Sequence, residues 1–385
     1  MPQMTTVHAT TEFRQAAWGG IASALELMVA AAGRARHRTL VLAVGPRDEV
    51  RPILPDVRVC TVGMPELMGR SLYRSARRVA LGRLAARRMA AVLPRLIGDG
   101  GADLLVHSEE LGTLLTAPVP VRRRIFVSHG LAVQEHPHRP DLLDQERRTL
   151  ALADTVVVLS AAQADVLRRG YPGLSRVRVL PLPLALLAQQ LSPVAAGGAA
   201  DGCVVAAGRA VRQKGFDILL RAVCEARVSG RTADGHRFPP VVVYAGHGDD
   251  DYLEECRRIA ARCGSAAILR PWLPREQLIE VLRRARLVCV PSRFEPVGLI
   301  AAEALALGVP VVASRVGGLP DVLGRPAAAG WTVPVTGDDG PAPADLAACL
   351  TTATRSATGP TRGPEQLRPW SVDRHLAALI RILDR

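Results

Sequence analysis

Residues 291–318 read PSRFEPVGLIAAEALALGVPVVASRVGG, and residues 206–219 read AAGRAVRQKGFDIL. Both stretches leave a short β-branched strand, pass through a glycine-bearing loop and enter a helical pattern. In the longer stretch the predicted helix begins near Gly298 and ends at Gly308, just before Pro310 and a further strand. This strand–helix–strand order predicts βαβ units and therefore a parallel sheet.

The same alternation extends over the whole chain of 385 residues, a length that favours two domains. We expect strands at Thr6–Ala9, Thr39–Val44, Val57–Val62, Asp103–His107, Arg124–Ser128, Thr155–Leu159, Val177–Leu180, Cys203–Ala207, Val241–Ala245, Ala267–Leu269, Leu287–Val290 and Val311–Ser314. The segment Pro181–Gly202 has no clear period, which indicates a linker.

The predicted fold class is α/β, with two doubly wound Rossmann-like domains facing a central cleft. The first domain covers residues 1–185 and is rejoined by a C-terminal helix within residues 370–385. A linker at 186–202 leads to the second domain, residues 203–369. Ligands of such sheets bind outside the carboxyl ends of the strands.

The formal net charge of +13 comes from arginines spread along the chain, together with a single lysine, Lys214. Asparagine is absent, so a GC-rich coding bias accounts for most of the arginine. Aromatic residues make up only 3% of the chain, too few to provide base-stacking platforms beside the arginines. We therefore expect no nucleic-acid partner.

The seven cysteines are scattered and form no CxxC pair, which predicts reduced core thiols. The N-terminus lacks the layout of a signal peptide, and no apolar run approaches the roughly 20 residues of a spanning helix. These features predict a cytoplasmic protein.

Two cations stand five residues apart at the carboxyl end of a predicted strand. Gly208 ends the strand, Arg209 and Lys214 follow, and Gly215 precedes the helix. Two such cations can converge on one anion, and a diphosphate is the natural candidate. The alternative is a pair of solvated charges in a βα loop, but the only lysine of the chain favours a function.

Two glutamates flank the start of the helix that begins near Gly298. Glu295 lies in the loop before it, and Glu303 lies about 7.5 Å along its axis from Gly298. The helix N-terminus offers free amides and partial positive charge to a phosphate. Glu303 stands among small alanines, where a carboxylate needs a partner. One glutamate can therefore meet a sugar while the other reaches a ribose.

Taken together, these motifs resemble the retaining GT-B glycosyltransferases of family 4. The matching features are the glutamate pair, the GR…KG element, the glycine loop Trp18–Ala22, the SHG segment at 128–130 and the YAGHG run at 244–248. One departure is the Leu180–Leu184 segment, LPLPL, which stands where many relatives have a Gly-Val-Asp-like element.

The resemblance implies a nucleoside-diphosphate sugar as donor, with UDP expected from family frequency, and a role for each matched residue. Arg209 and Lys214 would neutralise the diphosphate, and Glu303 would bind the ribose hydroxyls. Glu295 would hold the donor sugar, with His129 beside it. The backbone of Pro296, Val297, Gly298 and Leu299 would contact the donor, and Gly19 and Gly20 would approach the phosphates. Since cations and helix amides supply the charge, we expect no metal cofactor.

The acceptor should bind in the first domain, where acids follow the predicted strands: Glu12, Glu109, Glu110, Glu135, Asp141 and Asp144. A carboxylate cluster suits a small, amine-bearing polyol, and the chain resembles aminoglycoside-pathway transferases such as kanosaminyltransferases in length and composition. The competing interpretation, which we weigh almost equally, is that these acids cap helices and contact arginines. Alternatively, the basic amphipathic pattern at Arg70–Arg95 docks the enzyme on a membrane carrying a lipid acceptor, although arginine bias favours an ordinary surface helix.

Overall fold

The computed structural model describes residues 5–13, 20–68, 76–98, 101–135, 138–191, 202–228, 239–324, 330–335, 337, 339–356, 361 and 363–384. The chain divides into two compact units. Unit 1 comprises Met1–Pro183 together with Val372–Arg385, and unit 2 comprises Leu184–Ser371.

Unit 1 is built on an eight-stranded sheet with the order β3-β4-β2-β1-β5-β6-β7-β8. The strands are β1 (Thr5–Thr10), β2 (Arg38–Gly45), β3 (Glu49–Leu54), β4 (Val57–Gly63), β5 (Ala102–Val106), β6 (Val121–Ser128), β7 (Thr155–Val158) and β8 (Val177–Val179). All neighbouring strands are parallel except β3 and β4. The central strands β1, β2 and β5 are buried along almost their whole length because helices cover both faces of the sheet.

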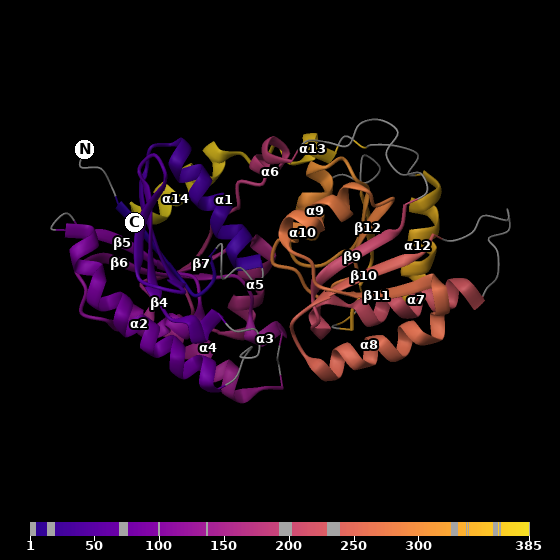
Figure 1. Cartoon of the computed structure of the whole chain (residues 1–385), viewed down its shortest axis with the longest axis horizontal. Coiled ribbons are helices and arrows are strands. Elements are labelled where there is room, and N and C mark those ends of the chain that lie inside the picture. Colours follow the sequence, from indigo (N-terminus) through magenta and orange to yellow (C-terminus); the bar gives the residue numbers. More distant parts are fainter. Residues whose placement is uncertain are drawn as a thin grey trace. The chain divides into compact units, whose positions relative to one another are not determined.

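The helices of unit 1 are α1 (Gly20–Arg34), α2 (Ala76–Ile97), α3 (Ala132–Glu135), α4 (Pro140–Leu152), α5 (Ala161–Gly170) and α14 (Val372–Leu383), with 3-10 turns η2 (Pro65–Met68) and η5 (Glu109–Thr116). Strand β2 shows how the two faces divide. Leu40 and Leu42 pack into the core that contains the buried residues of α2, whereas Val41 and Ala43 pack against α1. Figure 1 shows α2 and α4 on one side of this sheet and α1 and α14 on the other.

Unit 2 is built on a six-stranded sheet with the order β11-β10-β9-β12-β13-β14, all parallel. The strands are β9 (Val204–Arg209), β10 (Val241–Gly246), β11 (Ala267–Pro271), β12 (Leu287–Val290), β13 (Val311–Ser314) and β14 (Gly330–Val333). The helices are α6 (Ala185–Gln190), α7 (Phe216–Val228), α8 (Asp250–Cys263), α9 (Arg275–Arg283), α10 (Leu299–Ala306), α11 (Leu319–Leu323), α12 (Pro343–Ser356) and α13 (Gly363–Gln366), with 3-10 turns η6 (Arg212–Lys214) and η7 (Gly264–Ala266).

Helices cover both faces of the second sheet as well. Buried side chains of α7, α8 and α12 form one core with alternate residues of β9 and β10. Figure 1 shows α7 and α8 on one side of the sheet and α9 and α10 on the other. The expected fold class, two doubly wound α/β domains, is therefore confirmed within each unit.

Two strands were not expected from the sequence, and one helix lies within the predicted linker. Strand β3 contains two charged residues and Pro52, which an antiparallel edge strand tolerates because its outer side pairs with no neighbour. Strand β14 is only four residues long and extends the second sheet beside β13. Helix α6 covers part of the predicted linker 186–202 and buries Leu186 and Leu187 within unit 2, while residues 192–201 lie outside the described part of the chain.

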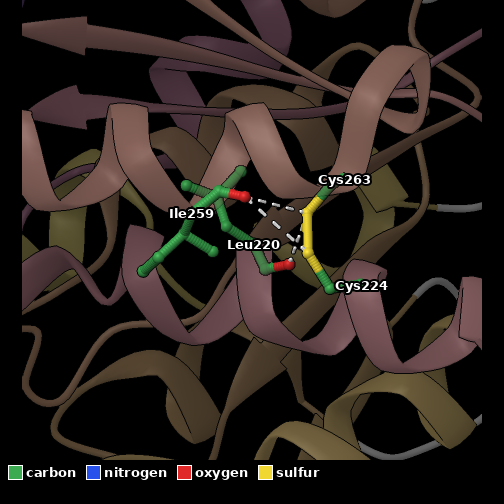
Figure 2. The surroundings of a disulfide bond; sticks show 4 residues. All are labelled: Leu220, Cys224, Ile259 and Cys263. Carbon is green, nitrogen blue, oxygen red and sulfur yellow. Dashed lines mark hydrogen bonds between the residues drawn. A yellow bond between two sulfur atoms is a disulfide. The ribbon is translucent and has the colours of Figure 1, made fainter.

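A disulfide joins α7 to α8 through Cys224 and Cys263, whose Cα atoms are 5.0 Å apart (Figure 2). The expectation that all seven cysteines are reduced is therefore wrong for this pair. The two residues are 39 positions apart, and they meet because α7 and α8 pack side by side on one face of the sheet. The remaining five are free thiols: Cys60, Cys203, Cys256, Cys289 and Cys349.

Candidate functional site

The loop after β9 carries Lys214 and is fixed by its own backbone. The amide of Lys214 donates to the carbonyl of Val211 (2.9 Å), and the amide of Gly215 donates to that of Arg212 (3.1 Å). Gly215 has φ +65°, and a Cβ there would lie 2.0 Å from the carbonyl oxygen of Pro291, so only glycine fits. This close contact brings the Lys214 loop against the loop that follows β12.

Hydrogen bonds join these two loops directly. Gln213 Nε2 donates to the carbonyl of Phe294 (3.0 Å), and the amide of Arg293 donates to the carbonyl of Gln213 (2.8 Å). As a result Lys214 Nζ forms an ion pair with Glu295 Oε1. Ser292 Oγ donates to the same carboxylate oxygen at 3.1 Å. The predicted diphosphate cation and the predicted sugar carboxylate are thus held together at the carboxyl edge of the sheet.

A buried ion pair lies behind these loops. Nη1 and Nη2 of Arg293 donate to Asp217, at 2.9 and 2.8 Å, and Tyr252 Oη donates to Asp217 Oδ1 at 2.7 Å. Burial alone would raise the pKa of Asp217, but the hydrogen bonds and charge of Arg293 hold it below its ordinary value. Asp217 is on α7, which follows the Lys214 loop, and Arg293 lies in the loop after β12 that also carries Glu295. This ion pair therefore links the two loops.

Gly298 begins the segment that points backbone amides at this edge. It has φ +89° and ψ 58°, and α10 follows it at Leu299. A Cβ at Gly298 would lie 2.4 Å from a side-chain carbon of the buried Leu319, so a larger residue would have to displace that side chain. The first amides of a helix have no partners within the helix, so α10 directs them and its partial positive charge toward the Glu295 loop. Pro296 and Val297, which precede Gly298, are buried.

Glu303 lies on α10 and is only 5% exposed. Its partner is Arg275, the first residue of α9, whose Nη1 lies 2.5 Å from Glu303 Oε1. Sequence reasoning required a partner for this carboxylate but did not identify Arg275. The signal was weak, since Arg275 is one of many arginines and only the packing of α9 beside α10 singles it out.

Arg209 is the last residue of β9, half-buried, and pairs in register with Gly246 of β10. Gly208 precedes it, and the methylene groups of Lys214 lie 3.5 Å from the position that a Gly208 Cβ would occupy. The predicted donor-site residues of the second half, from Gly208 to Glu303, therefore all lie around the carboxyl ends of β9 and β12. Gly20 is the exposed first residue of α1 in unit 1, and Gly19 lies outside the described residues.

In unit 1, His129 follows β6 and is hydrogen-bonded to a second histidine. Its Nε2 lies 2.8 Å from Nδ1 of His107, and Nε2 of His107 lies 2.9 Å from Nδ1 of His8. Burial lowers the pKa of His129 to about 4 and that of His8 to about 3. Sequence reasoning singled out His129 but missed His8 and His107, although both lie in predicted strands.

The loop that carries His129 is held by a buried glutamate, which the sequence analysis also missed. Glu146 of α4 accepts hydrogen bonds from the amides of Ala132 (2.8 Å) and Val133 (3.1 Å) and from Tyr171 Oη (2.5 Å). Burial raises the pKa of Glu146 despite these donors. Glu146 thus caps the short helix α3, three residues beyond His129, and fixes the loop.

The acids expected to bind an amine-bearing acceptor are largely engaged by arginines. Arg78 of α2, itself buried, donates to Glu110 Oε1 at 2.6 Å and lies 3.7 Å from Glu12 Oε1. Outside this cluster, Asp141 pairs with Arg139 and Asp144 pairs with Arg147. The alternative interpretation, in which these acids contact arginines, therefore describes at least four of the six.

Helix α2 uses its apolar side for packing. Met89 is fully buried, and Val92 packs against the core of unit 1. Among the described residues of α2, Leu84 is the one large apolar side chain that is exposed, at 47%. The pattern is that of a surface helix with most of its arginines outward and Arg78 buried, and residues 70–75 lie outside the described part. Among the described helices, none combines the length and apolar character needed to cross a membrane.

Within the described residues, no group of three or more His, Cys, Asp or Glu side chains is arranged to hold a metal ion. The acidic run 249–251 has another role, because Asp249 caps α8 by accepting a hydrogen bond from the amide of Tyr252 (3.1 Å). Metal independence itself stays a prediction.

Comparison with known proteins identifies relatives of the chain. The sequence pattern of the family described as Glycosyl transferases group 1 matches residues 202–353. A D-inositol 3-phosphate glycosyltransferase of Saccharomonospora viridis is 38% identical over 208 residues, which cover 50% of this chain and 46% of that protein. An alpha-maltose-1-phosphate synthase of Mycolicibacterium smegmatis is 30% identical over 282 residues, which cover 63% of this chain and 67% of that protein.

Solved structures share the fold over almost the whole chain. A sucrose-phosphate synthase from Thermosynechococcus elongatus has a TM-score of 0.72 at 21% identity and covers 99% of both chains. An alpha,alpha-trehalose-phosphate synthase (UDP-forming) from Burkholderia xenovorans, in complex with glucose-6-phosphate, has a TM-score of 0.70 at 15% identity, covering 99% of this chain and 100% of that one. At these identities the likeness shows the fold, which is that of the GT-B glycosyltransferases.

Proposed function

Because the chain belongs to the glycosyl transferases group 1 family, we propose that it transfers a sugar from a nucleoside diphosphate to a hydroxyl group of a small hydrophilic acceptor. The observation that carries the proposal is the Lys214–Glu295 ion pair, held at the carboxyl edge of the second sheet beside the start of α10. A cation, a carboxylate and free helix amides at one place suit a sugar diphosphate.

The division of labour follows from charge. Arg209, Lys214 and the amides of α10 would take the diphosphate, whose negative charge grows as the sugar departs. Glu295 would accept hydrogen bonds from sugar hydroxyls, and Glu303 would accept them from the ribose. Gly19 and Gly20 would let the first domain approach the phosphates. A uridine donor is our first choice, and we expect the reaction to take place in the cytoplasm without a metal ion.

The donor site is tested by removing one cation at a time. Lys214→Met and Arg209→Met should each lower kcat about a hundredfold, since one lost charge-assisted contact in the transition state costs roughly 3 kcal/mol. Arg212→Met is the matched control, because Arg212 lies in the same turn but its side chain pairs with Glu255 at 3.6 Å. Near-normal rates for both folded donor-site variants would remove the basis of the assignment.

For the acceptor, we propose a sugar or cyclitol phosphate. The support comes from the names of the relatives, which include a D-inositol 3-phosphate glycosyltransferase and an alpha-maltose-1-phosphate synthase. The first of these relatives is covered over less than half of its length, so the acceptor has to be tested on this chain. An amine-bearing aminoglycoside precursor is the second candidate, although Arg78 already contacts Glu12 and Glu110.

An acceptor screen by mass spectrometry separates these classes. One arm offers phosphorylated sugars and cyclitols, a second offers amine-bearing pseudodisaccharides, and a third offers lipid acceptors in vesicles. Transfer confined to the first arm supports the proposal. Transfer confined to the second restores the acidic-cluster interpretation, and transfer confined to the third supports the membrane alternative despite the packed apolar side of α2.

We further propose that the configuration of the donor is retained, as the resemblance to retaining transferases implies. An inverting enzyme needs a base opposite the leaving group, and His129 is the side chain that could serve. With an α-linked donor, the anomeric coupling constant of the purified product should show an α-linkage. A β-linked product would reject retention and assign His129 as the base.

A further inference from the structure

Three histidines of unit 1 form a continuous hydrogen-bonded row from the interior of the sheet to its carboxyl edge. His8 and His107 are 3% and 2% exposed, and His129, at the outer end, is half-buried. The ring centroids of His8 and His107 are 5.1 Å apart, and so are those of His107 and His129. Nothing in the proposed donor chemistry requires His8 or His107, so the row calls for a separate explanation.

Strand order and pleat bring the three rings together. Strands β1, β5 and β6 are neighbours in the sheet, and each contributes one histidine near its carboxyl end. The residues that precede His8 and His107, Val7 and Val106, belong to the core on the α2 side. Because side chains alternate along a strand, the rings project to the opposite side. The amide of His107 also donates to the carbonyl of Ala9 (2.8 Å), which extends the pairing of β1 and β5 as far as the row.

The row restricts where protons can sit. Burial lowers the pKa of all three rings, and each further positive ring would repel the next, so each neutral imidazole carries one N–H. Two hydrogen bonds in series then have a common direction. Either the protons are on Nδ1 of all three rings, or they are on Nε2 of all three.

The inner end of the row selects between the two directions. With protons on Nε2, the Nε2–H of His8 would have no hydrogen-bond acceptor among the described residues, in a residue that is only 3% exposed. An N–H without a protein acceptor in such a place is costlier than an unused lone pair on a neutral ring. The nearby His375 donates its own Nδ1–H to the carbonyl of Pro181 (2.8 Å) and makes no hydrogen bond to His8 among the described residues.

We propose that His8 and His107 are positioning residues that keep the proton of His129 on Nδ1, so that His129 presents a hydrogen-bond donor to the ligand. The bond from His107 occupies Nε2 of His129, which leaves Nδ1 as the ring nitrogen that a ligand oxygen can meet. That the ligand oxygen belongs to a sugar rests on the proposed function. In this arrangement His129 orients an oxygen and does not take a proton from the acceptor hydroxyl.

The tautomer of His129 is measured directly by long-range ¹H–¹⁵N correlation NMR on protein labelled with ¹⁵N-histidine, without donor or acceptor. Loss of one signal set in His129→Asn assigns the ring. We expect a protonated Nδ1 and an unprotonated Nε2 in the unaltered protein. His8→Phe should shift this balance even though His8 and His129 do not touch, and the exposed His138→Phe should leave it unchanged.

A second pair of variants separates positioning from mere packing. His107→Gln places its amide near the former Nε2 and can reach His8, whereas His107→Asn places it near the former Nδ1 and can reach His129. His107→Gln should lose the fixed tautomer and lower kcat/KM roughly tenfold, the effect of one hydrogen bond. His107→Asn should keep the ring orientation but give mixed tautomers, and it substitutes for His8→Phe if that variant does not fold.

Two results would overturn the inference. One is a proton on Nε2 of His129 in the unaltered protein, and the other is an unchanged tautomer in both His8→Phe and His107→Gln. Both results are NMR measurements that require no turnover. A failure of the proposed function would appear differently: no transfer would occur with any nucleotide sugar, while the proton of His129 would still be on Nδ1.

Discussion

The disulfide between Cys224 and Cys263 allows a sharp test of how unit 2 is stabilised. The perturbation is reduction, or the double substitution Cys224→Ala with Cys263→Ala. Cys263 is 1% exposed and Cys224 is half-buried, so the bond lies between α7 and α8 and away from solvent. Helix α7 begins immediately after Gly215, so the bond also anchors the element that follows the Lys214 loop.

The expected magnitude follows from the chain length that the bond closes. A separation of 39 residues restricts the unfolded chain by an entropy worth about 4 kcal/mol at 25 °C in the chain-entropy description. The folded state should tolerate reduction. Cys263 Sγ lies 3.3 Å from the carbonyl oxygen of Leu220 and 3.4 Å from that of Ile259, so a thiol there finds an acceptor at once (Figure 2).

The assay is urea unfolding of the protein with and without a reductant, combined with a thiol count in denaturant. We expect five accessible thiols before reduction and seven after it, with a fall of about 4 kcal/mol in the free energy of unfolding of unit 2. The double alanine variant should be insensitive to the reductant. Seven thiols in the untreated, denatured protein would show that the bond does not form and would refute the reasoning.

Three further predictions concern charge. Because the folded-state pKa of His8 is lowered to about 3, the unfolded chain binds more protons below pH 6.5, and acidification from pH 7 to pH 5 should cost about 2 kcal/mol of unfolding free energy for this histidine, measured by urea titration. This contribution is present above pH 6.5 and lost as pH falls toward 3, so His8→Phe should flatten that part of the stability profile. Asp217→Asn should lower stability by roughly 3 kcal/mol by leaving the guanidinium of Arg293 buried beside a neutral amide, and Asp217→Asn with Arg293→Met should recover much of that loss in a double-mutant cycle. Activity should survive EDTA, and loss of activity that Mn²⁺ restores would mean that the diphosphate site has been misassigned.

Much of the fold follows from local patterns, because buried parallel strands are short apolar runs between helices. Strand β2, with seven buried residues in a row, is an example. Strand β3 was not predicted because Glu49, Arg51 and Pro52 interrupt its pattern, and an edge strand needs no continuous apolar run. The predicted linker contained α6. Its leucines show no clear helical period, and their burial depends on packing against the rest of unit 2.

The candidate site was predictable where residues follow the carboxyl ends of predicted parallel strands. Glycines 208, 215 and 298 mark turns, and the residues around them meet because the carboxyl ends of parallel strands share one edge. Partners from distant elements were not predictable in this way. Arg275 reaches Glu303 through the packing of α9 against α10, and the histidine row requires the strand order β1-β5-β6. Neither the order of strands in a sheet nor the packing of one helix against another can be inferred from the spacing of residues in a single sequence.

The two signature glutamates also constrain how a donor can bind. Glu295 and Glu303 are each 5% exposed, and they pair with Lys214 and Arg275 respectively. Separating a buried carboxylate from the cation it pairs with costs several kcal/mol, more than one ribose or sugar hydroxyl returns. A carboxylate has about four lone-pair sites, the ammonium group of Lys214 has three donors and the guanidinium group of Arg275 has five, so each pair can keep its bond and still contact the ligand. We therefore expect the donor to add to both ion pairs and not to replace them, which leaves the diphosphate to be neutralised by Arg209, the remaining donors of Lys214 and the amides of α10.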